Sequence, residues 1–437
     1  MDIGFHYYLI KLLCVGLGMP EPDARIVAQS SQHVDDNIYW RKIDEGLSTE
    51  FPVVATFSID HRQSSDSTYP TLLLHFPPGD GPDVPGVARK DGKWFEGITT
   101  PGAKMAQESL DKAIQSGNLY LIGTAAHTMA DTHAHQGFSG CVHECNKNPA
   151  PSLFGRFLPP LGHGEFEHLP DLPVNWMDSR LKGEACKINN KERFYAAAKE
   201  IAEKLDPFIN PKSKKEEREF RINSVLEKVF KAFGEPIPAY ERKSSELELL
   251  AQVQIYDFRK LAQDEQFGGQ FMEIYDREKW RDASIFTQVR GIDDDKFADV
   301  FQDVVTSILP DKYYWMDTYY QNVKTHFEKS KSTTVKIYDV DTKVKFFETF
   351  PAKSTLKEWP EVVKNITCTP YYKFHVAAQT HLAHLIKKTE ERTARDKGGQ
   401  KIISLYKYYD DGKQEAWVGA MKKRTLAYRA EIYGDTE

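Results

Sequence analysis

The chain has 437 residues, which is enough for a large hydrophobic core and suggests two or three domains. Its 58 basic and 64 acidic residues give a formal net charge of −6, so no overall positive field recruits nucleic acid or an anionic membrane. Its five cysteines are too few and too scattered for a disulfide scaffold.

The amino-terminal segment predicts a buried helix rather than a targeting sequence. Residues 3–18 are apolar on most faces, and Pro20 and Pro22 end this helix. The apolar run lacks a basic leader and a small-residue cleavage site, is interrupted by Lys11, and is too short to span a bilayer. We therefore expect no transmembrane segment and a cytoplasmic location, with signal-independent export as the alternative.

Three further helices are expected before residue 137. One helix runs from Pro22 to residue 36, and an amphipathic helix from residue 102 stops at Gly117-Asn118. The last of the three, over residues 118–136, is nearly all apolar or small apart from its His and Asp residues. Such a helix is buried, and buried His and Asp side chains require partners or a metal ion.

The remainder of the chain has a different pattern. Long charged amphipathic helices are expected over residues 191–205, 214–234, 295–310 and 374–392, and alternating residues predict a β-hairpin over 333–350. The predicted fold class is thus mainly α with a small β-hairpin. We expect a metal-binding catalytic domain over residues 1–185 and a mostly helical accessory region over 186–437.

Metal-type side chains are concentrated at the start of the chain, where ten of the fourteen histidines precede residue 170. His127, Asp131 and His135 are spaced by four residues, which keeps them on one stripe of a helix. His163 and Glu167 repeat this spacing. Histidine and carboxylate ligands together suit zinc or a similar divalent ion.

This arrangement predicts more than one ion. Asp131 can bridge two cations through its two oxygens, and two ions about 3.5–4 Å apart activate water and neutralise a phosphoryl centre. Asp35 or Asp36 would orient the attacking metal-bound hydroxide or deprotonate the water from which it forms. The predicted metal ligands are His6, Asp35, His75, His127, Asp131, His135, His163 and Glu167.

The order of these residues resembles that of the zinc-dependent phospholipase C family, including the clostridial alpha-toxin type. The single-strand zinc nucleases of fungi and plants belong to the same superfamily. The segments that carry this likeness are SSQHVDDN, HTMAD and GHGEFE. The combination of FHYY, QHVDD and HTMADTHAHQGFSG also resembles a bacterial family of unknown function, which we place in this superfamily. The resemblance covers about residues 1–175 and implies an all-helical core with up to three zinc ions.

The resemblance also implies which residues hold each ion. Asp35, His75, His127 and Asp131 would hold the first ion, and His135, His163 and Glu167 the second. A third ion would use His6, Asp131 and the amino terminus. Two points stay open, because His133 competes with His135 as a ligand and Asp2 competes with the terminal amine of Met1.

The predicted function is therefore a zinc-dependent hydrolase of phosphate esters. Its substrate would be a small-molecule or lipid phosphoester; the net charge does not favour nucleic acid, and the sequence does not define an oligomeric state. One alternative is a non-catalytic protein with a structural zinc site. Another is an HD-type metal phosphohydrolase, although the chain has no His-Asp dipeptide at the candidate positions.

Other groups of residues have simpler interpretations. Cys141 and Cys145 read as loop thiols, with a disulfide or a metal contact as the alternative. Helix packing is favoured for the histidines near the carboxyl-terminal end (His375, His381 and His384) and for the aromatic cluster over residues 313–320.

Overall fold

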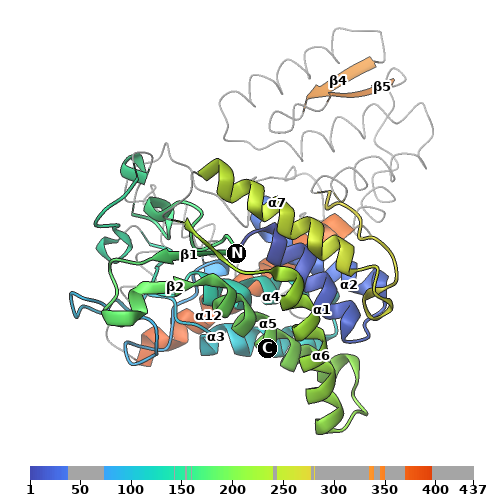
Figure 1. Cartoon of the computed structure of the whole chain (residues 1–437), viewed down its shortest axis with the longest axis horizontal. Coiled ribbons are helices and arrows are strands. Elements are labelled where there is room, and N and C mark those ends of the chain that lie inside the picture. Colours follow the sequence, from blue (N-terminus) through green and yellow to red (C-terminus); the bar gives the residue numbers. More distant parts are fainter. Residues whose placement is uncertain are drawn as a thin grey trace. The chain divides into compact units, whose positions relative to one another are not determined.

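The computed structural model describes residues 1–37, 73–141, 143–152, 155–158, 160–239, 244–276, 280, 334–338, 345–349 and 370–395. Contacts divide the chain into two compact units. The first contains residues 1–36, 56–275 and 377–437, and the second contains residues 37–55 and 276–376. The described elements are mainly helices, so the predicted fold class is confirmed (Figure 1). The expected boundary between residues 185 and 186 stays a prediction.

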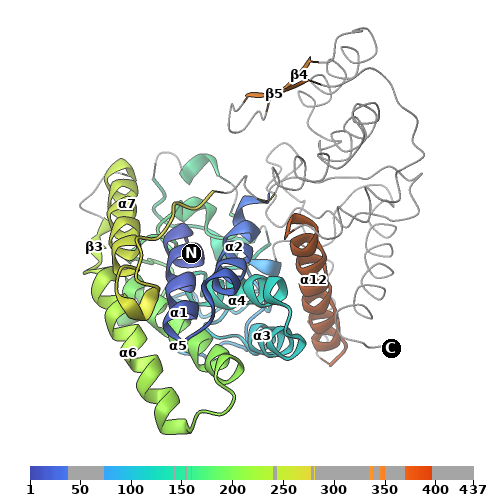
Figure 2. The same cartoon turned by 90° about the vertical axis from the view of Figure 1, so that its right-hand side faces the viewer.

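Helix α4 (Leu119–Ala134) lies at the centre of the first unit and is buried from Leu121 onward. It begins where the sequence predicts, because the side chain of Asn118 accepts hydrogen bonds from two backbone N–H groups of its first turn. Helices α2 (Glu21–Asp36), α3 (Lys104–Ser116) and α5 (Asn190–Ile209) pack around it (Figure 2).

Helices α2 and α4 approach each other closely at Gly123. A Cβ atom added to this glycine would lie 2.2 Å from the carbonyl oxygen of Val27 and 2.6 Å from Cβ of Ser30. Real Cβ atoms do not approach that closely, so a side chain here would force the two helices apart. The glycine therefore sets the spacing between two helices that carry candidate metal ligands.

The first helix is wound in two ways. Residues Gly4–Leu9 form a π-helix, η1, and Ile10–Gly16 continue as α1. All six residues of η1 are buried. The sequence predicted a helix here but not the π-winding, which is rare and is frequent at functional sites. His6 lies within this turn.

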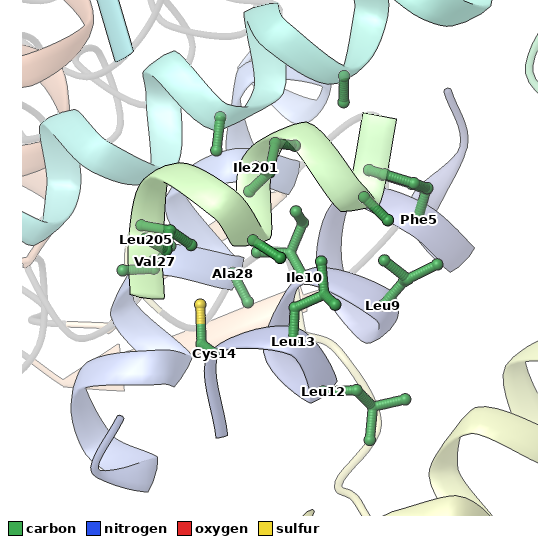
Figure 3. Packing of buried hydrophobic residues seen from close by; sticks show 14 of the residues in the cluster. Phe5, Leu9, Ile10, Leu12, Leu13, Cys14, Val27, Ala28, Ile201 and Leu205 are labelled. Carbon is green, nitrogen blue, oxygen red and sulfur yellow. The ribbon is translucent and has the colours of Figure 1, made fainter. Parts of the chain in front are cut away.

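The hydrophobic core joins α1, α2 and α5. Figure 3 shows Ile10 and Leu13 of α1 beside Val27 and Ala28 of α2 and Ile201 of α5. Helix α6 (Lys215–Phe233) adds further side chains to the same core, and α7 (Ser244–Leu261) packs against α6 and η1. Burying each large aliphatic side chain stabilises the fold by about 1.5–3 kcal/mol. This core holds the amino-terminal helices in place.

A small three-stranded sheet holds in place the loop that precedes strand β1. Strand β1 (Val174–Met177) pairs antiparallel with β2 (Lys187–Asn189) and parallel with β3 (Ile237–Pro238). The buried amide of Asn190 accepts a hydrogen bond from Trp176 Nε1 at 3.1 Å and donates to the carbonyl oxygens of Leu169 and Leu172, each at 2.7 Å. These bonds fix the backbone on both sides of Asp171.

The remaining elements complete the described part of the chain. Strands β4 (Thr334–Tyr338) and β5 (Lys345–Thr349) pair antiparallel, which confirms the predicted hairpin, whereas the helix expected over 295–310 lies outside the described residues. Helix α12 (Pro370–Arg395) contacts α3 through Lys388 Nζ, which lies 2.8 Å from Glu108. Short 3₁₀ helices are η3 (Glu144–Asn146), η4 (Gly155–Phe157), η5 (Gly164–Phe166), η6 (Gly183–Cys186) and η8 (Glu265–Phe267).

Across the described residues, no helix has the length and apolar character needed to cross a membrane.

Candidate metal centre

Histidine and aspartate side chains from five segments of the first unit converge beside α4. The π-helix η1 provides His6, the end of α2 provides Asp35, and the turn that follows residue 73 provides His75. Helix α4 and its C-cap provide His127, Asp131 and His135, and the loop over residues 163–171 provides the rest. Their ligand atoms form three groups of metal-binding size, two of which share His127.

Four of these side chains, Asp35, His75, His127 and Asp131, form what we call the Asp35 group. Oδ2 of Asp131 lies 3.1 Å from both His75 Nδ1 and His127 Nε2, and these two nitrogens are 3.1 Å apart. Oδ1 of Asp35 lies 3.6 and 3.8 Å from the same nitrogens. In a tetrahedral zinc site, bonds of about 2.0–2.1 Å place the ligand atoms about 3.3–3.4 Å apart. The Asp35 group therefore has the spacing of a tetrahedral zinc site.

The other oxygen of Asp131 faces a different set of atoms. Its Oδ1 lies 3.1 Å from Nε2 of His6 and 2.6 Å from the amino nitrogen of Met1. Oδ2 of Asp35 lies 3.9 Å from the same His6 nitrogen. Asp131 thus presents one oxygen to His75 and His127 and the other to His6, and its predicted bridging of two ions stays a prediction.

A second cluster, His135, His163 and Asp171, is called the Asp171 group. Oδ1 of Asp171 lies 3.0 Å from His135 Nε2, and its Oδ2 lies 3.2 Å from His163 Nε2. Nδ1 of His135 lies 2.9 Å from the carbonyl oxygen of His75, and Nδ1 of His163 lies 2.7 Å from that of Glu167. A carbonyl only accepts, so each Nδ1 carries the proton and donates it. This tautomer leaves each Nε2 with the lone pair that a metal ion needs.

Glu167 is the one predicted ligand that the structure does not bring to this cluster. The spacing argument required a helix through His163 and Glu167, but η5 covers only Gly164–Phe166, and Glu167 has a φ of 54°. Its carboxylate instead accepts a hydrogen bond from Ser152 Oγ. Asp171 lies where Glu167 was expected, and its position eight residues after His163 carries no helical signal.

The structure separates the alternatives at two other positions. Helix α4 ends at Ala134, so His135 at its C-cap faces Asp171, whereas Nε2 of His133 lies 3.5 Å from Glu200. Asp36 lies outside the groups of metal-binding size, and its Oδ2 accepts a hydrogen bond from Tyr275 at 2.6 Å. Of the two predicted catalytic aspartates, only Asp35 lies in a group that could hold a metal ion.

The amino terminus is a further part of the site. The amino nitrogen of Met1 lies 2.6 Å from Asp131 and 3.2 Å from Asp171, so it links the two groups. The sequence left Met1 and Asp2 open here, and the structure places the Met1 amine rather than the Asp2 carboxylate on Asp131. Burial opposes the charge of the amine, but Asp131 and Asp171 raise its pKa to about 11.

Burial and charge set the ionisation of the cluster. Burial lowers the pKa of His6 and of His163 to about 4, so both rings are neutral near pH 7. Burial opposes the ionisation of Asp131, but the surrounding His135 and the Met1 amine lower its pKa well below its usual range. Burial and then the charge of Asp131 raise the pKa of Asp35. The neutral rings of His6 and His163 and the ionised carboxylate of Asp131 are in the protonation states that bind divalent metal ions, whereas Asp35 gives up its proton less readily.

The loop over residues 163–171 lines a cavity of about 330 Å³, whose walls include Ser152, Glu165, Glu167 and Leu169.

The exposure to solvent differs between members of the cluster, because the side chain of Asp35 is 29% exposed whereas those of His127 and Asp131 are fully buried. Solvent therefore reaches the Asp35 group from the side of Asp35.

Residues with simpler interpretations lie apart from the cluster. Nε2 of His381 lies 2.9 Å from Thr128 Oγ1 in the contact between α12 and α4. Among the described residues, Cys14, Cys141, Cys145 and Cys186 are free thiols. The aromatic cluster over residues 313–320 lies outside the described residues.

The fold and the site define a mainly α protein with a buried histidine and aspartate cluster of a size that could bind metal ions. Residues 1–389 match the model of a family of unknown function, DUF6765, and the chain belongs to this family. No curated protein and no solved structure matches the chain.

Proposed function

We propose that this protein binds two or three divalent ions, with zinc as the best fit, and uses them to hydrolyse phosphate esters. The observation that carries the proposal is the position of Asp131, whose two oxygens face two different sets of nitrogen atoms at 3.1 Å. A carboxylate placed in this way holds two ions close together. Paired ions of this kind activate water and neutralise the charge of a phosphoryl group.

The donor set fits zinc. Two nitrogens and one oxygen of the Asp35 group are mutually 3.1 Å apart, and lone pairs that converge so closely repel one another unless a cation or protons lie between them. Imidazole and carboxylate ligands at tetrahedral spacing are typical of zinc. Another divalent ion with the same preferences is the alternative.

The two groups differ in a way that favours catalysis. The Asp35 group offers four ligands, which is the number that closes a structural site, whereas the Asp171 group offers three. A site with three protein ligands keeps a position open for water or substrate. In this proposal the Asp35 group anchors one ion, His6 and Oδ1 of Asp131 hold the ion that is paired with it, and the Asp171 group leaves a position open for the substrate at a third ion.

Asp35 would serve as a ligand, and its role in orienting or deprotonating water stays a prediction. The substrate class, a small-molecule or lipid phosphoester, and a cytoplasmic location also stay predictions. An HD-type mechanism has less support, because the ligands come from separated segments rather than from an adjacent His-Asp pair.

Metal content and hydrolysis test the proposal together. Protein carrying any purification tag at its carboxyl end, which leaves the Met1 amine untouched, is dialysed against metal-free buffer and subjected to elemental analysis. It is then incubated with p-nitrophenyl phosphate, bis-p-nitrophenyl phosphate, phosphatidylcholine vesicles and single-stranded DNA. We expect two or three zinc ions per chain and hydrolysis of at least one of these esters.

Asp131→Asn is the decisive variant, because it removes the bridging charge with little change of shape. We expect it to lose bound zinc and all hydrolysis. Asp111→Asn is the matched control, since Asp111 is about half exposed and its carboxylate contacts Lys204 on the surface. Full zinc content in Asp131→Asn would refute the proposal. One tightly held ion without hydrolysis would instead indicate the structural zinc alternative.

A further inference from the structure

A tyrosine far along the chain contacts the end of the helix that carries Asp35. The hydroxyl group of Tyr275 donates a hydrogen bond to Oδ2 of Asp36 at 2.6 Å. Asp36 is the last residue of α2, and the adjacent Asp35 belongs to the Asp35 group. Gln32, one turn earlier, also donates to Oδ2 of Asp36 at 3.4 Å. The short bond from Tyr275 therefore ties down the terminal turn of α2.

Tyr275 is itself held by the π-helix. Its backbone N–H donates to the hydroxyl group of Tyr8 at 3.0 Å, and its ring packs on that of Tyr7 with centroids 4.8 Å apart. Tyr7 and Tyr8 directly follow His6. Tyr275 thus connects the segment that carries His6 to the segment that carries Asp35.

The chain before Tyr275 is also fixed. The backbone N–H of Met272 donates to the carbonyl oxygen of Arg259 in α7 at 3.1 Å, and Arg259 Nε donates back to the carbonyl oxygen of Met272 at 2.8 Å. Tyr7 donates its hydroxyl hydrogen to Glu273 at 3.2 Å. The phenol of Tyr275 therefore reaches Asp36 from a rigid support rather than from a free loop end.

We propose that Tyr275 is a positioning residue for the Asp35 group: by holding Asp36, it directs the Asp35 carboxylate toward His75 and His127. Helix ends fray, and Asp35 is the next-to-last residue of α2. It is also the most exposed member of its group and the one farthest from the two histidine nitrogens, at 3.6 and 3.8 Å. The orientation of the Asp35 carboxylate consequently depends on the contacts that hold the final turn of α2. This inference rests on the proposed function, because it presupposes an ion at the Asp35 group.

Tyr275→Phe tests the inference, because it removes the hydroxyl group and keeps the ring that packs on Tyr7. Zinc affinity is measured by competition with a chromophoric chelator, and thermal unfolding is recorded on the metal-free protein. Loss of a group that orients a metal ligand typically lowers affinity about 10–100-fold. We expect the ion held by the Asp35 group to bind about 10-fold more weakly, and the ion held by the Asp171 group to bind as in the unmodified protein.

Tyr195→Phe is the matched control. It removes a hydroxyl group from an exposed tyrosine of α5 whose ring packs on Phe230 and which is not among the residues that hold Tyr275 or Asp36. We expect its zinc affinities to stay within about twofold of those of the unmodified protein. In an Asp36→Ala background, Tyr275→Phe should have no further effect on zinc affinity, because the two residues act through one bond.

The outcomes separate the two proposals. Unchanged affinity in Tyr275→Phe, or an equal loss at both ions together with a lower unfolding temperature, overturns the positioning role and leaves the proposed function intact. Additive losses in the double variant overturn it as well. Zinc binding with the expected Tyr275 effect but without hydrolysis supports the positioning role while refuting the proposed function. Absence of any zinc in the unmodified protein overturns both.

Discussion

The assignment of Asp171 in place of Glu167 can be tested by neutralising each carboxylate in turn. Asp171→Asn removes a charge whose two oxygens lie 3.0 and 3.2 Å from the ring nitrogens of His135 and His163. Glu167→Gln makes the same chemical change four residues earlier, where the carboxylate contacts Ser152. The two variants therefore form a matched pair.

The expected loss of zinc affinity follows from the number of ligands that hold the ion. Zinc binding to structural sites is worth about 10–16 kcal/mol. Divided equally among the three ligands of the Asp171 group, this gives about 3–5 kcal/mol for each ligand. At about 1.4 kcal/mol for each factor of ten, Asp171→Asn should weaken binding of this ion by about two to four orders of magnitude. Glu167→Gln should change it by less than about threefold.

Chelator competition and elemental analysis measure this difference. After dialysis against a chelator of intermediate affinity, Asp171→Asn should hold one ion fewer than the unmodified protein, and Glu167→Gln should hold the same number. Far-ultraviolet circular dichroism checks that both variants fold. The reasoning is refuted if Glu167→Gln loses the ion and Asp171→Asn keeps it.

Three further predictions concern other parts of the molecule. His135→Ala should lose the ion of the Asp171 group in elemental analysis and His133→Ala should keep it, since only His135 faces Asp171; the reverse result would exclude our assignment. Burial opposes the ionisation of Asp178, but hydrogen bonds from Arg180 lower the pKa of its carboxyl group. The ionised carboxylate therefore stabilises the fold above its unfolded pKa of about 3.9, and this stabilisation is lost as the pH falls through the folded pKa. Asp178→Asn should therefore cost about 3 kcal/mol of unfolding free energy at pH 7 and progressively less below about pH 4, as measured by urea titration; a cost that does not change with pH would contradict this. Gly123→Ala should lower the unfolding free energy by about 1–3 kcal/mol, because its new methyl group meets Val27 of α2, and unchanged stability would show that α2 and α4 can separate without cost.

The sequence predicted the parts of the site that follow helical periodicity. His127 and Asp131 lie one turn apart on α4, and their side chains meet at 3.1 Å as the spacing requires. The apolar surroundings of these residues also predicted their burial. Helical spacing is a local property, so one sequence was sufficient.

The site residues that the sequence did not predict depend on backbone conformation outside regular helices. The four-residue spacing of His163 and Glu167 has meaning only within a helix, and the left-handed backbone at Glu167 ends any helix there. Asp171 reaches His135 because Asn190 holds the loop through hydrogen bonds to the carbonyl groups on either side. Such a contact depends on tertiary structure and leaves no periodic signal. Likewise, the bond from Tyr275 to Asp36 joins residues 239 positions apart.

The π-helix at the amino terminus makes the site sensitive to the length of the chain. Within η1 the backbone hydrogen bonds run from residue i to i+5 instead of i+4, so this turn contains an additional residue. Deleting one residue between Gly4 and Leu9 would allow the segment to rewind as an ordinary α-helix without exposing the core that follows. Because the π-turn itself absorbs the additional residue, the residues on both sides would keep their places, and the amine of Met1 would stay beside Asp131. The side chains within the turn, His6 among them, would change direction instead. A single deletion here would thus move His6 away from Asp131 while the chain end and the fold stay as they are.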